Sequence, residues 1–506
     1  MKRSPSLKLN ILANYASQLY VTGIGIFILP IYIKYMGAEA YGLIGFFAML
    51  QAWFAMLDFG LTPTISRETA RYYGGSTPAL NYLRLFRALS LIFIGIALLG
   101  GVSLWVFAEP IALKWLDFKE LSQNEVVFAV EVMGVSVALR WLCGLYRGVI
   151  TGFERIVLLS AFNVVIATLR FVIVFVTMGM FGFTPEIFFL HQLVVAVLEL
   201  LGLYVISKKL IPNSNEASES LGWSIKPVKP ILKFSLTIAF TSFVWVLITQ
   251  SDKLILSGIL PLDEYGFFSL AVMVASGVLV VSGPVSNAIM PRMARLYSEK
   301  KNSELISVYK KSTQLVCIFA GSVAFLMVIY AEKLIYVWTG DAEITEQVSP
   351  ILKLYSFGNG LLLVTAFPYY LQYAIGNLRY HFLGNAASAF VLIPSIIVAA
   401  QHYGAFGAGV TWVAINLIYL FFWVGYVHHK LFPGLHFEWL FKDCLLVALP
   451  SLAFMYITSF VQVNFDNRVL DFIYLMLILS VSVVIAFLFS SYRSFVFSKM
   501  RGCQVS

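Results

Sequence analysis

The chain has 506 residues, of which 60% are hydrophobic and only 12% are charged, and its formal net charge is +9. Soluble globular proteins carry about 25% charged residues, so this composition excludes an ordinary soluble protein and predicts a polytopic membrane protein. The net charge does not indicate nucleic-acid binding, because the basic residues lie mostly in alternate loops between apolar segments.

Apolar segments of about 20 residues, the length that spans a bilayer, recur along the whole chain. The first begins near Leu9 and is too long for the apolar region of a signal peptide, so we expect an uncleaved span. The sequence therefore predicts an all-α polytopic membrane protein with about 14 transmembrane helices. The predicted spans are residues 9–33, 41–62, 86–107, 126–150, 156–180, 185–207, 231–257, 264–290, 311–337, 348–375, 380–400, 404–429, 442–463 and 468–490.

The distribution of lysine and arginine predicts the orientation of these spans. If the N-terminus is cytoplasmic, the cytoplasmic segments hold 26 of the 35 basic residues, the outer segments hold six, and three lie within spans. Cytoplasmic loops of membrane proteins carry such an excess of positive charge. We therefore expect both termini to be cytoplasmic.

An internal repeat divides the chain. At an offset of 224 residues, Tyr265-Gly266 corresponds to Tyr41-Gly42 and Ala294-Arg295 to Ala70-Arg71. The repeat contains six spans, an even number, so both halves cross the membrane in the same sense as parallel repeats. The predicted domains are a six-helix lobe at 1–210, a cytoplasmic linker at 211–230, a second six-helix lobe at 231–430, and two extra helices with a cytoplasmic tail at 431–506.

Signatures of catalysis are missing from the sequence. It contains no nucleotide-binding P-loop, no histidine-rich metal cluster and no nucleophile elbow. The four cysteines have no metal-site spacing, so we expect neither a metal nor a disulfide. We therefore predict a transporter without a cofactor rather than an enzyme.

Polar side chains at helical spacing lie inside several predicted spans, where exposure to lipid is costly. Arg140 and Arg147 fall on one face of the span 126–150, and Asn163 and Arg170 fall on one face of the next. We expect these faces to turn inward and to form a hydrated, positively charged cavity. The candidate substrate-binding residues are Arg140, Arg170, Lys253, Arg147, Asn14, Gln18, Asn163 and Gln250.

Four acidic residues lie near or within spans, and two interpretations of them stay open. They either couple transport to H⁺ or Na⁺ or form ion pairs, Lys253 with Asp252 or Asp58 and Arg140 with Glu131 or Glu199. Asp58 alternatively shapes a helix end. The candidates for these roles are Asp58, Asp252, Glu131 and Glu199.

Arginines near the predicted cytoplasmic ends of spans also have two interpretations. They act only as orientation signals and anchors for lipid headgroups, which we favour, or they form a cytoplasmic entrance that captures an anionic headgroup. The residues concerned are Arg67, Arg71, Arg84, Arg87, Arg292 and Arg295.

Short motifs in both halves resemble the polysaccharide transport family, the Wzx-type O-antigen flippases of the multidrug/oligosaccharidyl-lipid/polysaccharide exporter superfamily. The resemblance covers most of the first twelve spans. The motifs are Leu29-Pro30, Gly37-Ala38-Glu39-Ala40-Tyr41-Gly42, Asp58-Phe59-Gly60-Leu61 and Arg67-Glu68 in the first half, and Asp252-Lys253-Leu254-Ile255-Leu256, Glu264-Tyr265-Gly266-Phe267-Phe268-Ser269-Leu270-Ala271 and Pro291-Arg292 in the second.

The resemblance implies alternating access by two six-helix lobes in a bacterial inner membrane. The implied substrate is an undecaprenyl-diphosphate-linked oligosaccharide, such as an O-antigen repeat unit of lipopolysaccharide, moved from the cytoplasmic to the periplasmic leaflet. Implied partners are membrane lipids, H⁺ or Na⁺, and a polysaccharide polymerase with its chain-length machinery. The physics agrees, since a diphosphate with a sugar does not cross hydrocarbon unaided and arginine suits phosphate.

Two other functions are compatible with a polytopic chain of this size. A cation-coupled multidrug antiporter of the same superfamily predicts an acidic central face instead of a basic one. A polysaccharide polymerase predicts a large external loop, which the sequence lacks. Loss of surface glycan, against a change in drug sensitivity, separates the first of these from a flippase.

Overall fold

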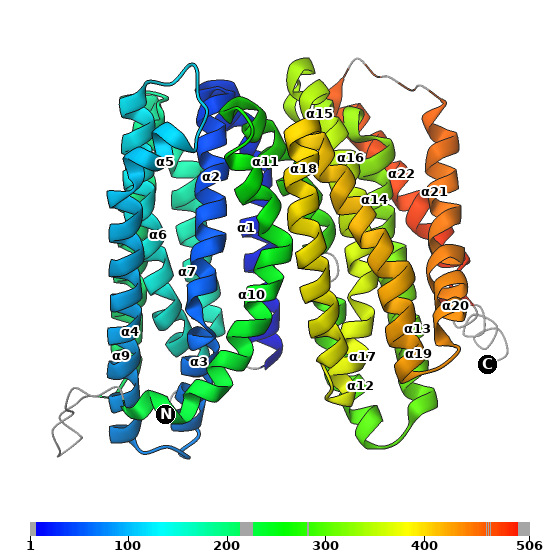
Figure 1. The fold of residues 1–506 in the computed structure, drawn as a ribbon, viewed down its shortest axis with the longest axis horizontal. Helices are drawn as coiled ribbons and strands as arrows, with labels where there is room; N and C mark the ends of the chain where they lie inside the picture. The colour runs from blue at the N-terminus through cyan, green and yellow to red at the C-terminus, as the bar shows by residue number, and fades with distance from the viewer. Residues whose placement is uncertain are drawn as a thin grey trace. The chain divides into compact units, whose positions relative to one another are not determined.

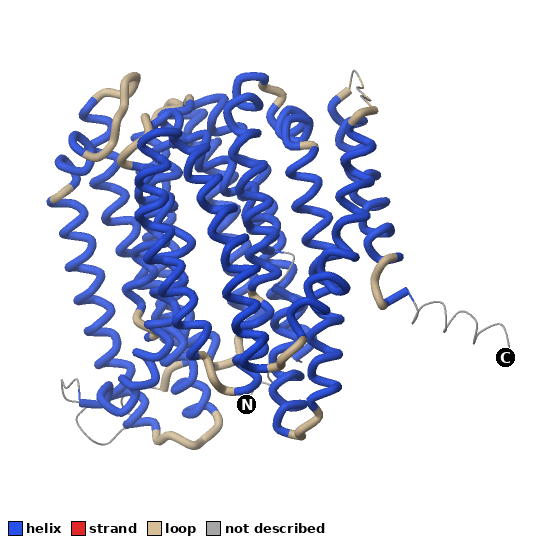
Figure 2. Tube along the Cα trace, turned by 45° about the vertical axis from the view of Figure 1, so that its right-hand side comes forward, coloured by secondary structure: helices blue, strands red, loops and turns tan. Residues whose placement is uncertain are grey.

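The regular elements of the computed structural model are all helical in the part that it describes, which is residues 7–212, 226–280, 283–461, 463, 465 and 467–493 (Figure 2). This confirms the predicted all-α membrane class. The chain divides into two compact units, Met1–Gly266 and Phe267–Ser506.

The first unit contains long apolar helices and short helices that connect them (Figure 1). They are α1 (Leu7–Met36), α2 (Ala38–Ala55), η1 (Met56–Asp58), α3 (Leu61–Tyr73), α4 (Ala79–Val106), α5 (Ala108–Lys114), α6 (Gln123–Gly152), α7 (Ile156–Thr168), η2 (Leu169–Ile173), α8 (Val174–Phe181), α9 (Pro185–Leu210), η4 (Lys226–Val228) and α10 (Lys229–Ser257). Helix α11 (Leu262–Val280) begins in this unit and ends in the second.

The second unit continues this pattern, and several of its spans contain a π-helical segment with a wider turn than an α-helix. Its helices are α12 (Gly283–Ser298), α13 (Asn302–Val316), η5 (Cys317–Gly321), α14 (Ser322–Ile329), α15 (Ala331–Thr339), α16 (Ala342–Thr365), α17 (Phe367–Ile375), α18 (Arg379–Ile418), η6 (Tyr419–Val424), α19 (Gly425–Leu431), α20 (Leu435–Glu438), η7 (Trp439–Leu445), α21 (Leu446–Ser459) and α22 (Arg468–Leu488).

Twelve helical segments of the described residues are long and apolar enough to cross a membrane. One of them, Arg379–Leu431, contains the two predicted spans 380–400 and 404–429, with Gly404 in a non-helical conformation where they join. The seventh predicted span coincides with α10, many of whose side chains lie outside the described residues. The exact number of fourteen spans stays a prediction.

The division between the units falls later than the predicted linker at 211–230, because α10 packs on α2 and α3 of the first unit. Residues 213–225 of that linker lie outside the described residues. The extra C-terminal helices α21 and α22 pack on α14 of the second unit. The assignment of two six-helix lobes as moving bodies stays a prediction.

Helix α6 is the centre of the first unit, and α3, α4, α5 and α9 pack around it. Glycines permit the closest of these contacts. A Cβ at Gly148 would lie 2.9 Å from the carbonyl oxygen of Thr62, and one at Gly152 would lie 2.5 Å from that of Ser66. Small residues allow helix backbones to approach in membrane proteins, and this approach fixes α3 against the end of α6.

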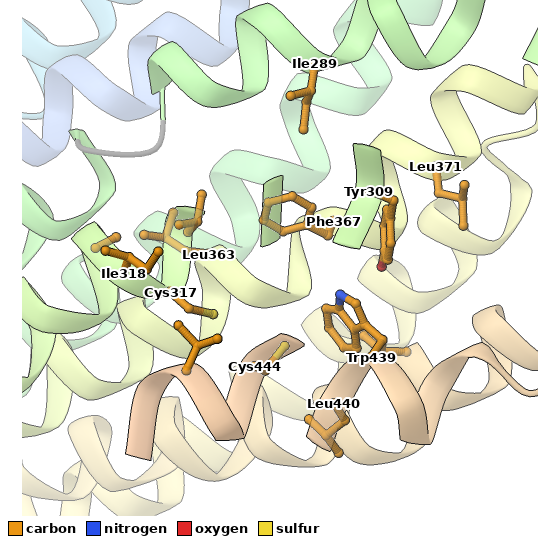
Figure 3. Close-up of a cluster of buried hydrophobic side chains, with 14 of the residues drawn as sticks. Ile289, Tyr309, Cys317, Ile318, Leu363, Phe367, Leu371, Trp439, Leu440 and Cys444 are labelled. Carbon is orange, nitrogen blue, oxygen red and sulfur yellow. The ribbon is translucent and has the colours of Figure 1, made fainter. Parts of the chain in front are cut away.

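Aliphatic side chains pack around Tyr309, Phe367 and Trp439 in the core of the second unit (Figure 3). Trp439 and Tyr309 are fully buried, and each uses its polar atom, as buried tryptophan and tyrosine generally do. Trp439 donates from Nε1 to Thr313 Oγ1 (2.9 Å), and the Tyr309 hydroxyl lies 2.7 Å from His428 Nε2. These bonds join α13 to α19 and η7, so this part of the second unit is a satisfied structural core.

Candidate functional site

Polar side chains from four helical spans line one cavity of about 420 Å³ within the first unit. The cavity contains five of the eight predicted substrate-binding residues together with Glu199, whereas Arg140, Lys253 and Gln250 do not line it. Its polar lining residues are Asn14, Ser17, Gln18 and Thr22 on α1, Arg147 on α6, Asn163 on α7, Arg170 on η2 and Glu199 on α9.

Glu199 bridges two arginines in this cavity. Its Oε1 accepts from Arg147 Nη2 at 2.6 Å, and its Oε2 accepts from Arg170 Nη2 at 2.9 Å. Arg147 Nη1 also donates to Asn163 Oδ1 at 2.6 Å. The side chain of Glu199 is only 5% exposed, whereas those of Arg147 and Arg170 are 30% and 25% exposed. Both arginine side chains are thus more exposed than the carboxylate that they share, and all three line the cavity.

Arg140 extends the positive charge without a carboxylate partner. Its Nη1 donates to Gln51 Oε1 (2.9 Å), its Nη2 donates to Gln192 Oε1 (2.7 Å), and its guanidinium lies 5.0 Å from the centre of the Phe47 ring. No carboxylate of the described residues lies within ion-pair distance of it, so the described structure shows a pair with neither Glu131 nor Glu199. Three guanidinium groups against one carboxylate leave a net charge of +2 on this set.

Lys253 lies apart from the cavity. Its Nζ donates to the Thr249 carbonyl at 2.8 Å and lies 3.6 Å from Asp252 Oδ1, so the proposed pairing with its neighbour is present. Asp252 also accepts from the Lys253 amide at 2.8 Å. The backbone carbonyl of Gln250 accepts from Trp53 Nε1 at 3.4 Å. These three predicted residues thus lie together on α10, where the Gln250 carbonyl contacts α2 and Lys253 contacts its own helix.

Asp58 shapes the start of α3. Its Oδ1 accepts from the amide of Thr62 at 3.1 Å and from the Thr62 hydroxyl at 2.6 Å. The first turn of a helix has unpaired amides, and such an acceptor satisfies one of them. Of the three roles considered for Asp58, this geometry supports the shaping of a helix end.

Substituting Asp58 tests this role. Asp58→Ala is expected to lower the free energy of unfolding by about 1 kcal/mol, because the Thr62 amide loses its acceptor. Asp58→Asn keeps an acceptor and should retain most of that stability. Thermal unfolding of the purified protein in detergent measures both. A transporter that is stable but inactive with Asp58→Asn would instead assign the carboxylate to ion coupling.

The remaining candidates lie outside the cavity. Glu131 is half-buried on α6 and contributes nothing to the cavity lining. Arg71 pairs with Glu68 at 3.2 Å, and Arg295 pairs with Glu299 at 3.6 Å, with both arginines well exposed. Exposed pairs contribute little stability. The entrance role stays a prediction for the whole group, which is distributed over α3 (Arg67, Arg71), α4 (Arg84, Arg87) and α12 (Arg292, Arg295).

Two glutamines that bind Arg140 are not among the residues predicted from the sequence. Gln192 is fully buried on α9, and Gln51 is half-buried on α2. One signal was available for Gln192, because it precedes Glu199 by seven residues and so shares its helical face. Gln51 offered none, since an isolated amide in an apolar segment does not reveal its partner.

Comparisons with known proteins agree with this architecture. The model of the family described as "Polysaccharide biosynthesis protein" matches residues 7–297, and the MatE model matches residues 237–398. A curated relative, the "Putative O-antigen transporter" of Shigella flexneri, is 19% identical over 383 residues, which is 74% of this chain and 87% of the relative.

Solved structures show the same fold at low sequence identity. "Lipid II flippase MurJ, inward closed conformation" superposes with a TM-score of 0.71 at 17% identity, covering 96% of this chain and 99% of that one. An inward-facing multidrug resistance MATE family transporter of the MOP superfamily superposes with a TM-score of 0.63 at 12% identity, covering 83% and 97%. Because the first family model covers more than half of the 506 residues, the chain belongs to the polysaccharide biosynthesis protein family.

Proposed function

We propose that this protein is a flippase for an undecaprenyl-diphosphate-linked oligosaccharide, an O-antigen or similar repeat unit, which it moves from the cytoplasmic to the periplasmic leaflet of a bacterial inner membrane. The family membership and the relative named as an O-antigen transporter support the substrate class. The observation that carries the proposal is the cavity in which Arg147 and Arg170 share one carboxylate.

The charge of the cavity suits a diphosphate. Each guanidinium group presents several N–H donors in a fixed plane, which matches phosphate oxygens. Arg147 and Arg170 together carry two positive charges against the single negative charge of Glu199, so the cavity retains one positive charge for an anionic ligand. Hydroxyl and amide groups along α1, including Asn14 and Gln18, offer neutral hydrogen bonds of the kind that a sugar uses.

The apolar part of the substrate has a different requirement. A prenyl chain is stable in the hydrocarbon of the bilayer, so only the diphosphate and the sugar need a polar path. Alternating access by the two predicted lobes, at 1–210 and 231–430, would expose that path to one leaflet at a time. Both termini are proposed to be cytoplasmic, in agreement with the bias of lysine and arginine.

A cation-coupled multidrug antiporter is the second candidate function. The match of the MatE model to residues 237–398 and the likeness to a MATE transporter favour it. The polar cavity of the first unit opposes it, because a cationic drug would meet two guanidinium groups and only one carboxylate there. A flippase is therefore the better interpretation.

Deletion of the gene and complementation by the wild-type chain test the proposal. The deletion strain should lose surface polysaccharide and accumulate lipid-linked repeat units on the cytoplasmic leaflet, and the wild-type chain should restore both. Normal surface glycan with increased drug sensitivity would instead support the antiporter. Accumulation of single units on the periplasmic leaflet would indicate a polymerase.

A further inference from the structure

The span that carries Arg170 contains a π-helical segment, η2, between α7 and α8. Three consecutive carbonyl oxygens of η2 accept hydrogen bonds from side chains of other helices. His191 Nε2 lies 2.9 Å from the Leu169 oxygen, and Gln192 Nε2 donates to the Arg170 oxygen at 3.0 Å. The Tyr32 hydroxyl donates to the third oxygen, that of Phe171, at 3.4 Å.

Both ring nitrogens of His191 have hydrogen-bonding partners. A carbonyl oxygen only accepts, so Nε2 of His191 must carry the hydrogen toward Leu169. Its Nδ1 then faces the hydroxyl of Thr177 at 3.0 Å. Through these two contacts His191 links η2 and α8 to α9.

This arrangement distinguishes η2 from the other π-helical segments of the described chain. Among the described residues, no carbonyl of η5, η6 or η7 accepts from a side chain of another span, and the Ile318 carbonyl of η5 accepts only from Ser322 of the same span. A π-helical segment holds one residue more than the equivalent α-helical turn. If η2 became α-helical, the residues on one side of it would shift in register by one position. Their side chains would then turn by about 100° around the helix axis.

We infer that Gln192 and His191 are positioning residues that hold η2 in its π-helical form and thereby keep Arg170 directed at Glu199 and the cavity. Gln192 contacts both arginines. Its Oε1 accepts from the Arg140 guanidinium, and its Nε2 donates to the backbone carbonyl of Arg170. Its side chain is buried, so both bonds are shielded from water. The inference deepens the proposed function and rests on it where anion binding is concerned.

The first test measures binding of farnesyl diphosphate, a short prenyl diphosphate, to the purified full chain in lipid nanodiscs by calorimetry. Gln192→Leu removes both bonds and should weaken binding about tenfold. His191→Leu should weaken it less, and His191→Gln, which keeps a donor for Leu169, should restore it to within about twofold of the wild type. Wild-type affinity in Gln192→Leu would overturn the inference.

Asn359 provides a matched control in the second unit. Its buried amide donates to the Ala275 carbonyl at 3.0 Å and accepts from Trp412 Nε1 at 3.2 Å, the same pair of roles that Gln192 has. Asn359→Leu should destabilise the protein and leave the affinity for farnesyl diphosphate unchanged. Equal losses of affinity in Gln192→Leu and Asn359→Leu would reduce Gln192 to a structural residue and contradict the inference.

The second test needs no ligand. Arg170→Cys is introduced into a chain without its native cysteines, and its reaction with a water-soluble methanethiosulfonate reagent is timed. Adding Gln192→Leu should slow this reaction at least about fivefold, because position 170 turns away from the cavity, and an unchanged rate would overturn the inference. If the wild type binds no farnesyl diphosphate, the proposed function fails, while the thiol rates still decide whether Gln192 positions η2.

Discussion

Replacing Arg147 and Arg170 together by glutamine is expected to lower flipping of a fluorescent prenyl-diphosphate-linked sugar by about 100-fold in proteoliposomes. Each arginine offers charge-assisted hydrogen bonds to the diphosphate, worth about 1.5 kcal/mol or more apiece. Two such losses amount to about 3 kcal/mol, and each 1.4 kcal/mol corresponds to a factor of ten. The double substitution also changes the charge of the cavity from +1 to −1, because Glu199 remains.

The single substitutions should be milder than the double one. In Arg147→Gln, Glu199 still has Arg170 as a partner, and in Arg170→Gln it still has Arg147. In the wild type these partners lie 2.9 Å and 2.6 Å from the carboxylate. Lysine at either position retains the charge but loses the planar fork, so Arg→Lys should fall between glutamine and the wild type. An ordering in which lysine equals glutamine would show that geometry matters more than charge.

Two exposed lysines supply the charge-matched control. Lys301 pairs with Glu299 at 2.9 Å and is 51% exposed, and Lys353 pairs with Glu332 at 2.7 Å and is 38% exposed. Replacing both by glutamine removes the same total charge at residues that do not line the cavity. Flipping should change by less than about twofold, because exposed ion pairs contribute little. A loss as large as that of the arginine pair would mean that net charge, and not the cavity, controls transport.

The sequence predicted the helical class and most of the cavity because both depend on simple spacing. Arg147 with Arg140, and Arg170 with Asn163, were placed inward since charged groups avoid lipid, and the structure brings Arg147, Arg170 and Asn163 to one cavity. Lys253, for which the same rule predicts an inward position, does not line this cavity. An intramembrane charge is equally well satisfied by a neighbour on its own helix, and Asp252 and the Thr249 carbonyl satisfy this one.

Other features were not predictable because they depend on the backbone. The π-helical form of η2 follows from contacts of its carbonyl oxygens with Tyr32, His191 and Gln192, and a hydrophobicity pattern carries no information about such contacts. That Arg140 pairs with no carboxylate of the described residues was also hidden, since Glu131 on the same helix and Glu199 were equally good candidates. Only the packing of α2 and α9 against α6 selects Gln51 and Gln192 instead.

Glu199→Gln should produce a protein that binds anions more tightly but is less stable and flips more slowly. Without the carboxylate, the positive charges of Arg147 and Arg170 repel each other. Removing one partner of a buried ion pair lowers the free energy of unfolding by on the order of 3 kcal/mol. The added positive charge should tighten binding of farnesyl diphosphate on the order of tenfold. Tighter binding then slows release in the other leaflet. Calorimetry, thermal unfolding and the flipping assay measure the three effects, with Glu186→Gln, an exposed carboxylate on the same helix, as the control.

Combining Glu199→Gln with Arg147→Gln separates net charge from geometry. The double variant keeps the charge of +1 that the wild-type cavity has, but it presents one guanidinium group instead of two. Stability should return close to that of the wild type, because no like charges remain unpaired, and a double-mutant cycle gives the coupling. Affinity for the diphosphate should nevertheless stay about tenfold below that of the wild type, since the second guanidinium group is missing. Wild-type affinity in this variant would show that the charge of the cavity alone selects the anion, and the case for paired arginines would fail.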